Sequence, residues 1–128
     1  MVDILANALT QIKNAEKVAK ASCVIKPVSN LLRDVLTLLK EEGYIGDFET
    51  IDDGKGGIIN VNLLGRINEC GAIRPRFSVS KNEFEKFEKR YLPSKNYGII
   101  IVSTNQGIIT NEKAKKMNIG GTLLAFVY

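Results

Sequence analysis

The sequence has no histidine, no tryptophan and only two cysteines. Without histidine, it lacks the most common general base and metal ligand of proteins. Cys23 and Cys70 are 47 positions apart, so they form no closely spaced metal-ligand pair. The apolar neighbours of Cys23 indicate a small buried side chain. We therefore expect no metal site, no cofactor and a reducing compartment.

Long apolar runs are also missing, and every uninterrupted one is far too short to span a bilayer. The first residues, Met1-Val2-Asp3, carry an acid where a signal peptide would carry a basic segment. These features predict a cytoplasmic protein without a membrane segment.

No catalytic set is visible. Ser103 and Thr104 are hydroxyls with no neighbouring lysine or acid to activate them. The run Gly54-Lys55-Gly56-Gly57 lacks the spacing of a phosphate-binding loop, whose lysine ends a longer glycine-framed loop between a strand and a helix. The sequence therefore argues against an enzyme.

Charge is unevenly distributed along the 128 residues. The formal net charge is +4, made of −2 over residues 1–64 and +6 over residues 65–128. A basic half favours a polyanionic partner, of which nucleic acid is the usual one. The alternative is that the excess lysine only aids solubility.

The first half shows an alternation of helical and strand patterns. Apolar residues at helical spacing predict a helix from Ile4 to Ala19, and Lys13, Lys17 and Lys20 share its outer side. A strand at Cys23–Pro27 and a helix over residues 31–39, capped by Ser29 or Asn30, follow. Two strands, Tyr44–Ile51 and Ile58–Leu64, joined by the glycine-rich loop 52–57, complete an N-terminal α/β lobe.

A polar, glycine-bounded connector, Gly65–Gly71, is the predicted boundary between lobes 1–64 and 65–128. Beyond it, extended chain carries Arg74 and Arg76 around a proline. Phe84, Phe87 and Tyr91 then recur at helical spacing, a pattern more typical of core than of a base-stacking platform. A short helix over residues 111–118 and a terminal strand, Thr122–Tyr128, are also predicted.

The stretch from Gly98 to Thr110 passes from a buried strand to a polar segment. Four β-branched residues, Ile99–Val102, favour a strand covered on both faces. The uncharged segment Ser103-Thr104-Asn105-Gln106-Gly107 follows as a polar loop, and Thr110 can cap the next helix. A polar loop held between ordered elements is a typical binding surface.

Ser103-Thr104-Asn105-Gln106-Gly107 and the later Gly120-Gly121 resemble motifs of the small-subunit ribosomal protein eight family, the universal S-eight family. Leu5–Leu9, Lys26–Ser29 and Gly43–Phe48 are also similar to family segments. The run Cys70–Phe77 resembles the archaeal and eukaryotic branch. The resemblance extends over essentially the whole chain.

This resemblance implies an α+β chain of two small packed lobes, the second of them strand-rich. It implies a non-enzymatic constituent of the small ribosomal subunit of cytosolic ribosomes, which acts there as a monomer. Its partners would be an irregular helix in the central domain of small-subunit ribosomal RNA and neighbouring small-subunit proteins. The implied RNA-binding residues are Ser103, Thr104, Asn105, Gln106, Gly107, Gly120, Gly121, Thr122, Lys13, Asn14, Pro27, Ser29, Arg74 and Arg76.

Physical chemistry is consistent with that implication. The wide, shallow minor groove of RNA exposes 2′-hydroxyls, which short neutral side chains can reach. Nearby lysines and arginines, such as Lys113, Lys115 and Lys116, can neutralise phosphates. Two alternatives remain from the residues alone. The apolar terminal strand can add to a partner's sheet, or Ser103 can serve a small enzyme.

Overall fold

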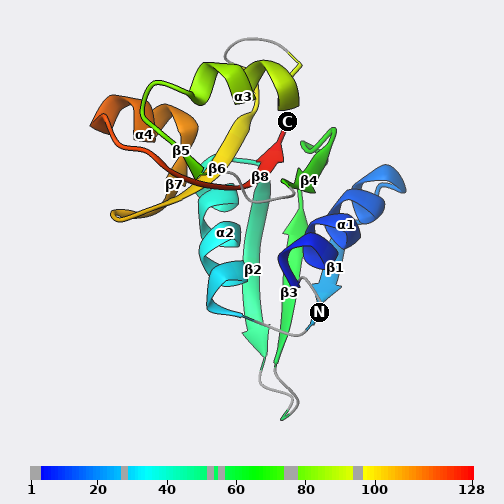
Figure 1. Ribbon diagram of the computed structural model, residues 1–128. Helices are drawn as coiled ribbons and strands as arrows, with labels where there is room; N and C mark the ends of the chain where they lie inside the picture. Colours follow the sequence, from blue (N-terminus) through cyan, green and yellow to red (C-terminus); the bar gives the residue numbers. More distant parts are fainter. Residues whose placement is uncertain (1–3, 27–28, 52–53, 55–56, 74–77, 94–96) are drawn as a thin grey trace. The chain divides into compact units, whose positions relative to one another are not determined.

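The computed structural model describes residues 4–26, 29–51, 54, 57–73, 78–93 and 97–128. Pro27, Arg74, Arg76 and most of the glycine-rich loop 52–57 lie outside these residues. The structure contains helices and strands in two separate sheets, so the mixed α+β class is confirmed (Figure 1). The chain divides into two compact units, Met1–Glu69 and Cys70–Tyr128.

The first unit is a three-stranded antiparallel sheet with two helices. In chain order its elements are α1 (Ile4–Lys17), β1 (Ser22–Ile25), α2 (Asn30–Glu41), β2 (Ile45–Ile51) and β3 (Ile58–Leu63). The sheet order is β1-β3-β2, which leaves β1 and β2 as edge strands. On β3 the side chains of Ile59, Val61 and Leu63 are buried, whereas Asn60 and Asn62 point to the other face. The predicted order of helices and strands is confirmed.

Two helix boundaries in this unit have local causes. Ser29 is the N-cap of α2, because its Oγ accepts a hydrogen bond from the backbone N–H of Leu32 at 3.1 Å. Helix α1 ends at Lys17, two residues before the predicted Ala19. Ala19 itself has a φ of +57°, a left-handed conformation that a helix cannot continue through.

The second unit is a five-stranded antiparallel sheet with two short helices. Its elements are β4 (Cys70–Ala72), β5 (Ser78–Val79), α3 (Phe84–Tyr91), β6 (Ile99–Thr104), β7 (Gly107–Thr110), α4 (Asn111–Met117) and β8 (Gly121–Val127). The strands follow the order β4-β8-β6-β7, and β5 also pairs with β8. Strand β8 is therefore central, with paired neighbours on both sides.

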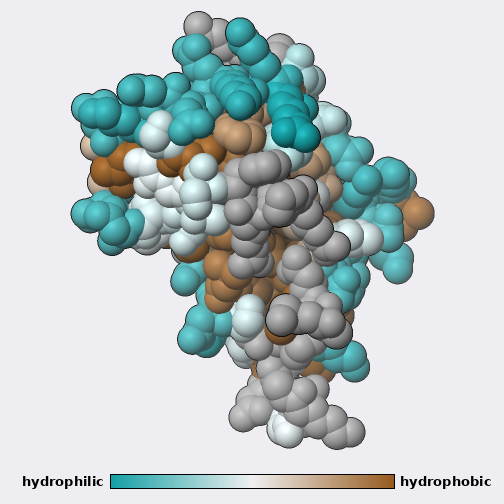
Figure 2. All heavy atoms as spheres, in the orientation of Figure 1, coloured by the Kyte–Doolittle hydropathy of each residue, from teal (hydrophilic) through white to brown (hydrophobic). Residues whose placement is uncertain are grey.

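One hydrophobic cluster of the second unit lies on one face of this sheet. Phe84 and Phe87 of α3 and Ala114 of α4 pack with Ile100 and Val102 of β6. The prediction that the aromatic stripe belongs to the core is thus confirmed. Ile99 and Ile101 alternate with the β6 residues of this cluster and are also buried, so the start of β6 is covered on both faces, as predicted. Hydrophilic residues cover the outward sides of α3 and α4 (Figure 2).

The division between the two units, after Glu69, falls inside the predicted connector Gly65–Gly71, and the last two residues of that connector pair with β8 as part of β4. Two sequence-based assignments in this unit are wrong. The terminal strand is Gly121–Val127, one residue earlier than predicted at both ends. The segment Gly107–Thr110, for which the sequence predicted no strand, forms β7 and pairs with β6.

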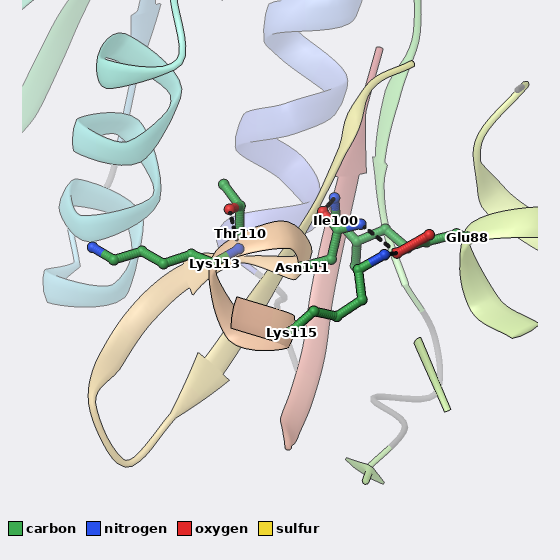
Figure 3. Close-up of polar contacts among 6 residues, drawn as sticks. All are labelled: Glu88, Ile100, Thr110, Asn111, Lys113 and Lys115. Atoms are coloured by element: carbon green, nitrogen blue, oxygen red, sulfur yellow. Dashed lines mark hydrogen bonds and ion pairs between the residues drawn. The ribbon is translucent and has the colours of Figure 1, made fainter. Parts of the chain in front are cut away.

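Asn111, the first residue of α4, ties together three elements. Its Oδ1 accepts a hydrogen bond from the backbone N–H of Ile100 at 3.1 Å, and its Nδ2 donates to Glu88 Oε1 at 2.8 Å (Figure 3). Lys115 Nζ lies 2.6 Å from the same Glu88 oxygen. Asn111 is only 3% exposed. The position requires one acceptor and one donor on the same side chain, which an asparagine amide supplies.

We predict that Asn111→Asp lowers the free energy of unfolding by about 2–3 kcal/mol at neutral pH, because a buried carboxylate replaces the donor that faces Glu88. The repulsion raises the pKa of the new carboxyl. The lost stability is therefore regained as the pH falls through that pKa. Urea unfolding at several pH values measures this.

Asn118→Asp is the matched control, since Asn118 is the exposed C-cap of the same helix. It should cost less than about 1 kcal/mol, the size of an unfavourable charge at a helix C-terminus. Equal losses for both variants would contradict a special role for Asn111.

Candidate nucleic-acid interface

The polar segment predicted as a loop is the end of a tight β-hairpin. Ser103 and Thr104 belong to β6, where they pair with Ile108 and Gly107 of β7. The turn between the strands consists of Asn105 and Gln106 alone. Gly107 has a φ of +107°, and neither turn residue has a positive φ. A glycine closing an ordinary turn is a common hairpin geometry, so the position of Gly107 follows from backbone conformation.

The Thr104 hydroxyl holds this turn together. Its Oγ1 donates to the carbonyl oxygen of Gly107 at 2.9 Å and accepts from the backbone N–H of Gln106 at 3.1 Å. The donor of this hydroxyl is therefore already used, and one acceptor position remains. Thr104 shapes the hairpin, whereas Asn105 and Gln106 are exposed at its tip.

Ser103 has a different environment from Thr104. Its side chain points to the sheet face opposite the cluster that contains Val102 and Phe84, because Val102 and Thr104 alternate with it along β6. Ser103 pairs directly with Thr122 of β8, and Thr122 pairs with Ser78 of β5. Directly opposed side chains in an antiparallel sheet have Cβ atoms about 4.5–5.5 Å apart. Three hydroxyls thus form a row across β5, β8 and β6, which we call the hydroxyl row.

The side chains of the hydroxyl row are accessible to a binding partner. Ser103 and Thr122 are half-buried, and Ser78 is exposed. In the part of the chain that the structure describes, none of the three side chains has a hydrogen-bond partner. Ser78 was not among the residues expected from the sequence. Only the pairing of β5 with β8, two strands more than 40 positions apart, places it here.

Gly120 and Gly121 are required by contacts within the sheet. A Cβ atom on Gly121 would meet the Ser103 carbonyl oxygen, and one on Gly120 would meet the Val79 carbonyl oxygen, both closer than any real Cβ contact. Their backbone therefore approaches neighbouring strands of the same chain. Gly121 in particular lets β8 lie against β6 beside the hydroxyl row.

Two of the three lysines of α4 are free to meet phosphates. Lys113 and Lys116 are exposed, and Figure 3 shows the Lys113 side chain extending away from the polar network. Lys115 instead points toward Glu88, with which it forms an ion pair. Thr110 caps the helix as predicted, since its Oγ1 accepts from Lys113 N at 3.2 Å.

Some of the RNA-binding residues expected in the first unit already have partners within the protein. Lys13 forms an ion pair with Glu69, with Nζ 2.5 Å from Oε1, so its charge is already offset. Asn14 is exposed. Ser29 uses its hydroxyl as the acceptor that caps α2 and keeps its donor. Pro27, Arg74 and Arg76 lie outside the described residues.

The described residues contain no group of three or more Cys, Asp or Glu side chains that could bind a metal ion. No helix within them is long and apolar enough to cross a membrane.

We predict that Gly121→Ala lowers the free energy of unfolding by at least about 2 kcal/mol, because its Cβ would overlap backbone that cannot move independently. Gly71→Ala is the matched control in the same sheet. There the nearest atoms are ring carbons of Phe126 at 3.3 Å. We expect a change within about 1 kcal/mol for it. Similar unfolding midpoints in urea would show that β8 and β6 are not in such close contact.

Comparison with known proteins identifies the family. The sequence profile of ribosomal protein S8 matches residues 3–128. The chain is also 53% identical to the small ribosomal subunit protein uS8 of the archaeon Methanococcoides burtonii, over 100% of this chain and 98% of that protein. Both matches extend through the hairpin and the hydroxyl row. The chain belongs to the ribosomal protein S8 family.

Proposed function

We propose that the chain is a structural constituent of the small ribosomal subunit that binds an irregular helix in the central domain of small-subunit ribosomal RNA. Membership of this family supports a structural role in the ribosome and argues against an enzymatic one. The observation that supports an RNA contact is the hydroxyl row, in which Ser78, Thr122 and Ser103 lie side by side. Their side chains have no hydrogen-bond partner among the described residues.

The row suits the minor groove of RNA. A hydroxyl both donates and accepts, so it can pair with a 2′-hydroxyl or a base edge there. Because Ser103 and Thr122 are held on adjacent strands, their spacing is fixed before RNA binds. Asn105 and Gln106 extend the same polar edge from the hairpin tip, and Thr104 keeps that tip in shape.

Charge supplies the second part of the interaction. Lys113 and Lys116 are the exposed cations of α4, the helix that directly follows the hairpin. Phosphate contacts of this kind raise affinity for any RNA and weaken with salt. We therefore assign recognition to the hydroxyls and non-specific attraction to the lysines. We also propose that the predicted second lobe, residues 65–128, provides most of the RNA interface.

The first unit contributes fewer groups. Asn14 and the donor of Ser29 are available, and Pro27, Arg74 and Arg76 remain candidates from the sequence alone. Lys13 contributes less than its charge suggests, since it is paired with Glu69. The similarity to an archaeal protein supports placing this chain in a cytosolic ribosome.

Strand addition to the terminal strand is not available as an alternative. Strand β8 pairs with β6 on one side, and with β4 and β5 on the other. The gap between β4 and β5 is spanned by the hydrogen bond from Ile73 N to Leu124 O at 3.0 Å. A partner strand would have to displace one of these neighbours.

The proposal is tested by titrating the protein with the central-domain RNA hairpin and with a scrambled duplex of equal length, over a salt series. We expect tight, salt-resistant binding to the hairpin only. Ser103→Ala should weaken hairpin binding about ten-fold without lowering stability, because one hydrogen bond is lost and no internal partner is orphaned.

Lys113→Gln combined with Lys116→Gln is the contrasting variant. It should weaken binding to both RNAs and reduce the dependence of affinity on salt. Equal and salt-sensitive binding of the wild-type protein to both RNAs would contradict recognition by the hydroxyl row.

A further inference from the structure

Strand β1 has an open edge within the first unit. It pairs only with β3, and no strand among the described residues pairs with its other side. The backbone N–H of Leu63 donates to the carbonyl oxygen of Ala21 at 2.9 Å. Backbone groups alternate in direction along an antiparallel strand. The N–H and C=O groups of Cys23 and Ile25 therefore also face β3, and those of Ser22 and Val24 point away from it. The edge thus presents unpaired donors and acceptors.

A groove runs beside this edge, between β1 and the C-terminal half of α1. One wall is formed by Gln11, Asn14 and Ala15 of α1 and by Val18, which directly follows that helix, and the other wall by Ser22, Cys23 and Val24 of β1. Lys20 also lines the groove. Burial raises the pKa of the Cys23 thiol, and the smaller opposing effect of Lys20 does not reverse this. The thiol is therefore neutral, and this part of the groove is apolar.

Exposed apolar side chains mark both walls. Val18 is 65% exposed and Val24 is 54% exposed, the two largest values among the large hydrophobic residues described. An added strand would alternate its side chains between the groove and the opposite face of the sheet. Its inward side chains would contact Val18 and Cys23, and its outward ones would contact Val24.

The charges around the edge define the partner further. Lys17, Lys20 and Lys26 are exposed and have no ion-pair partner among the described residues. Among the described residues that line the groove, none carries a carboxylate. Lysines beside an open strand repel a second copy of the same edge, whereas they attract an acidic segment.

We propose that the β1 edge and its groove bind an extended, acidic segment of a neighbouring small-subunit protein, which pairs with β1 as an additional strand. Main-chain hydrogen bonds to Ser22 and Val24 give the contact its direction, and alternating apolar side chains fill the groove. The proposal rests on the assembly of this chain into the small subunit, but not on the RNA contacts of the hydroxyl row.

The test uses assembled small subunits that contain the protein with a photoreactive benzoylphenylalanine at position 24. We expect a crosslink to a protein segment rich in Asp and Glu, identified by mass spectrometry. The same probe at Thr37, an exposed residue of α2, is the control and should not capture that segment. Crosslinks from position 24 only to RNA, or to no other molecule, would overturn the proposal.

A pair of variants tests the backbone contact. Val24→Pro removes the outward N–H and leaves the groups that bond β3 untouched, whereas Val24→Thr keeps that N–H. In subunits assembled with these variants, which carry no crosslinker, Val24→Pro should lower the amount of the previously crosslinked protein at least ten-fold by quantitative mass spectrometry, and Val24→Thr should not. Both proteins should keep wild-type affinity for the RNA hairpin, which separates this contact from the proposed RNA site. Unchanged occupancy with Val24→Pro would refute strand addition.

Discussion

The close approach of β8 to β6 at Gly121 is the constraint on which the candidate interface depends. A side chain at this position would collide with the Ser103 carbonyl oxygen, so only glycine allows the two strands to pair here. This pairing sets Ser103 opposite Thr122, and the pairing of β8 with β5 adds Ser78. The position of each hydroxyl is therefore determined by the hydrogen bonds of the sheet. A surface of small neutral groups can recognise RNA shape only if it is rigid in this way.

Rigidity on the opposite side of the sheet comes from a different source. Asn111 connects β6 to α3 and α4 through one acceptor and one donor. Together with Thr110, which caps α4, it fixes the chain directly after the hairpin. The same short helix then displays Lys113 and Lys116, while Glu88 holds Lys115. Lysines adjacent in sequence thus differ in whether they are available to phosphate.

Much of this fold follows from local patterns, whereas the strand pairing that brings the three hydroxyls together does not. The β-branched run Ile99–Val102 predicts its strand, and Thr110 predicts its cap, because both depend on neighbouring residues. Ser103 and Thr104 carry no strand pattern, and they become strand only by pairing with β7 and β8. Ser78 joins the row through residues more than 40 positions away. The need for glycine at position 121 likewise arises from a strand elsewhere in the chain.

We propose that the partner of Ser103 in the RNA is a 2′-hydroxyl. The experiment compares an all-ribose hairpin with one that carries 2′-deoxy substitutions in the strand that contacts the protein. Binding of both RNAs is measured with the wild-type protein and with Ser103→Ala. We expect Ser103→Ala to weaken binding to the all-ribose hairpin about ten-fold and to have little effect on the substituted one, because both changes remove the same hydrogen bond. An equal loss of affinity for both RNAs on Ser103→Ala, so that the two changes add, would contradict this contact.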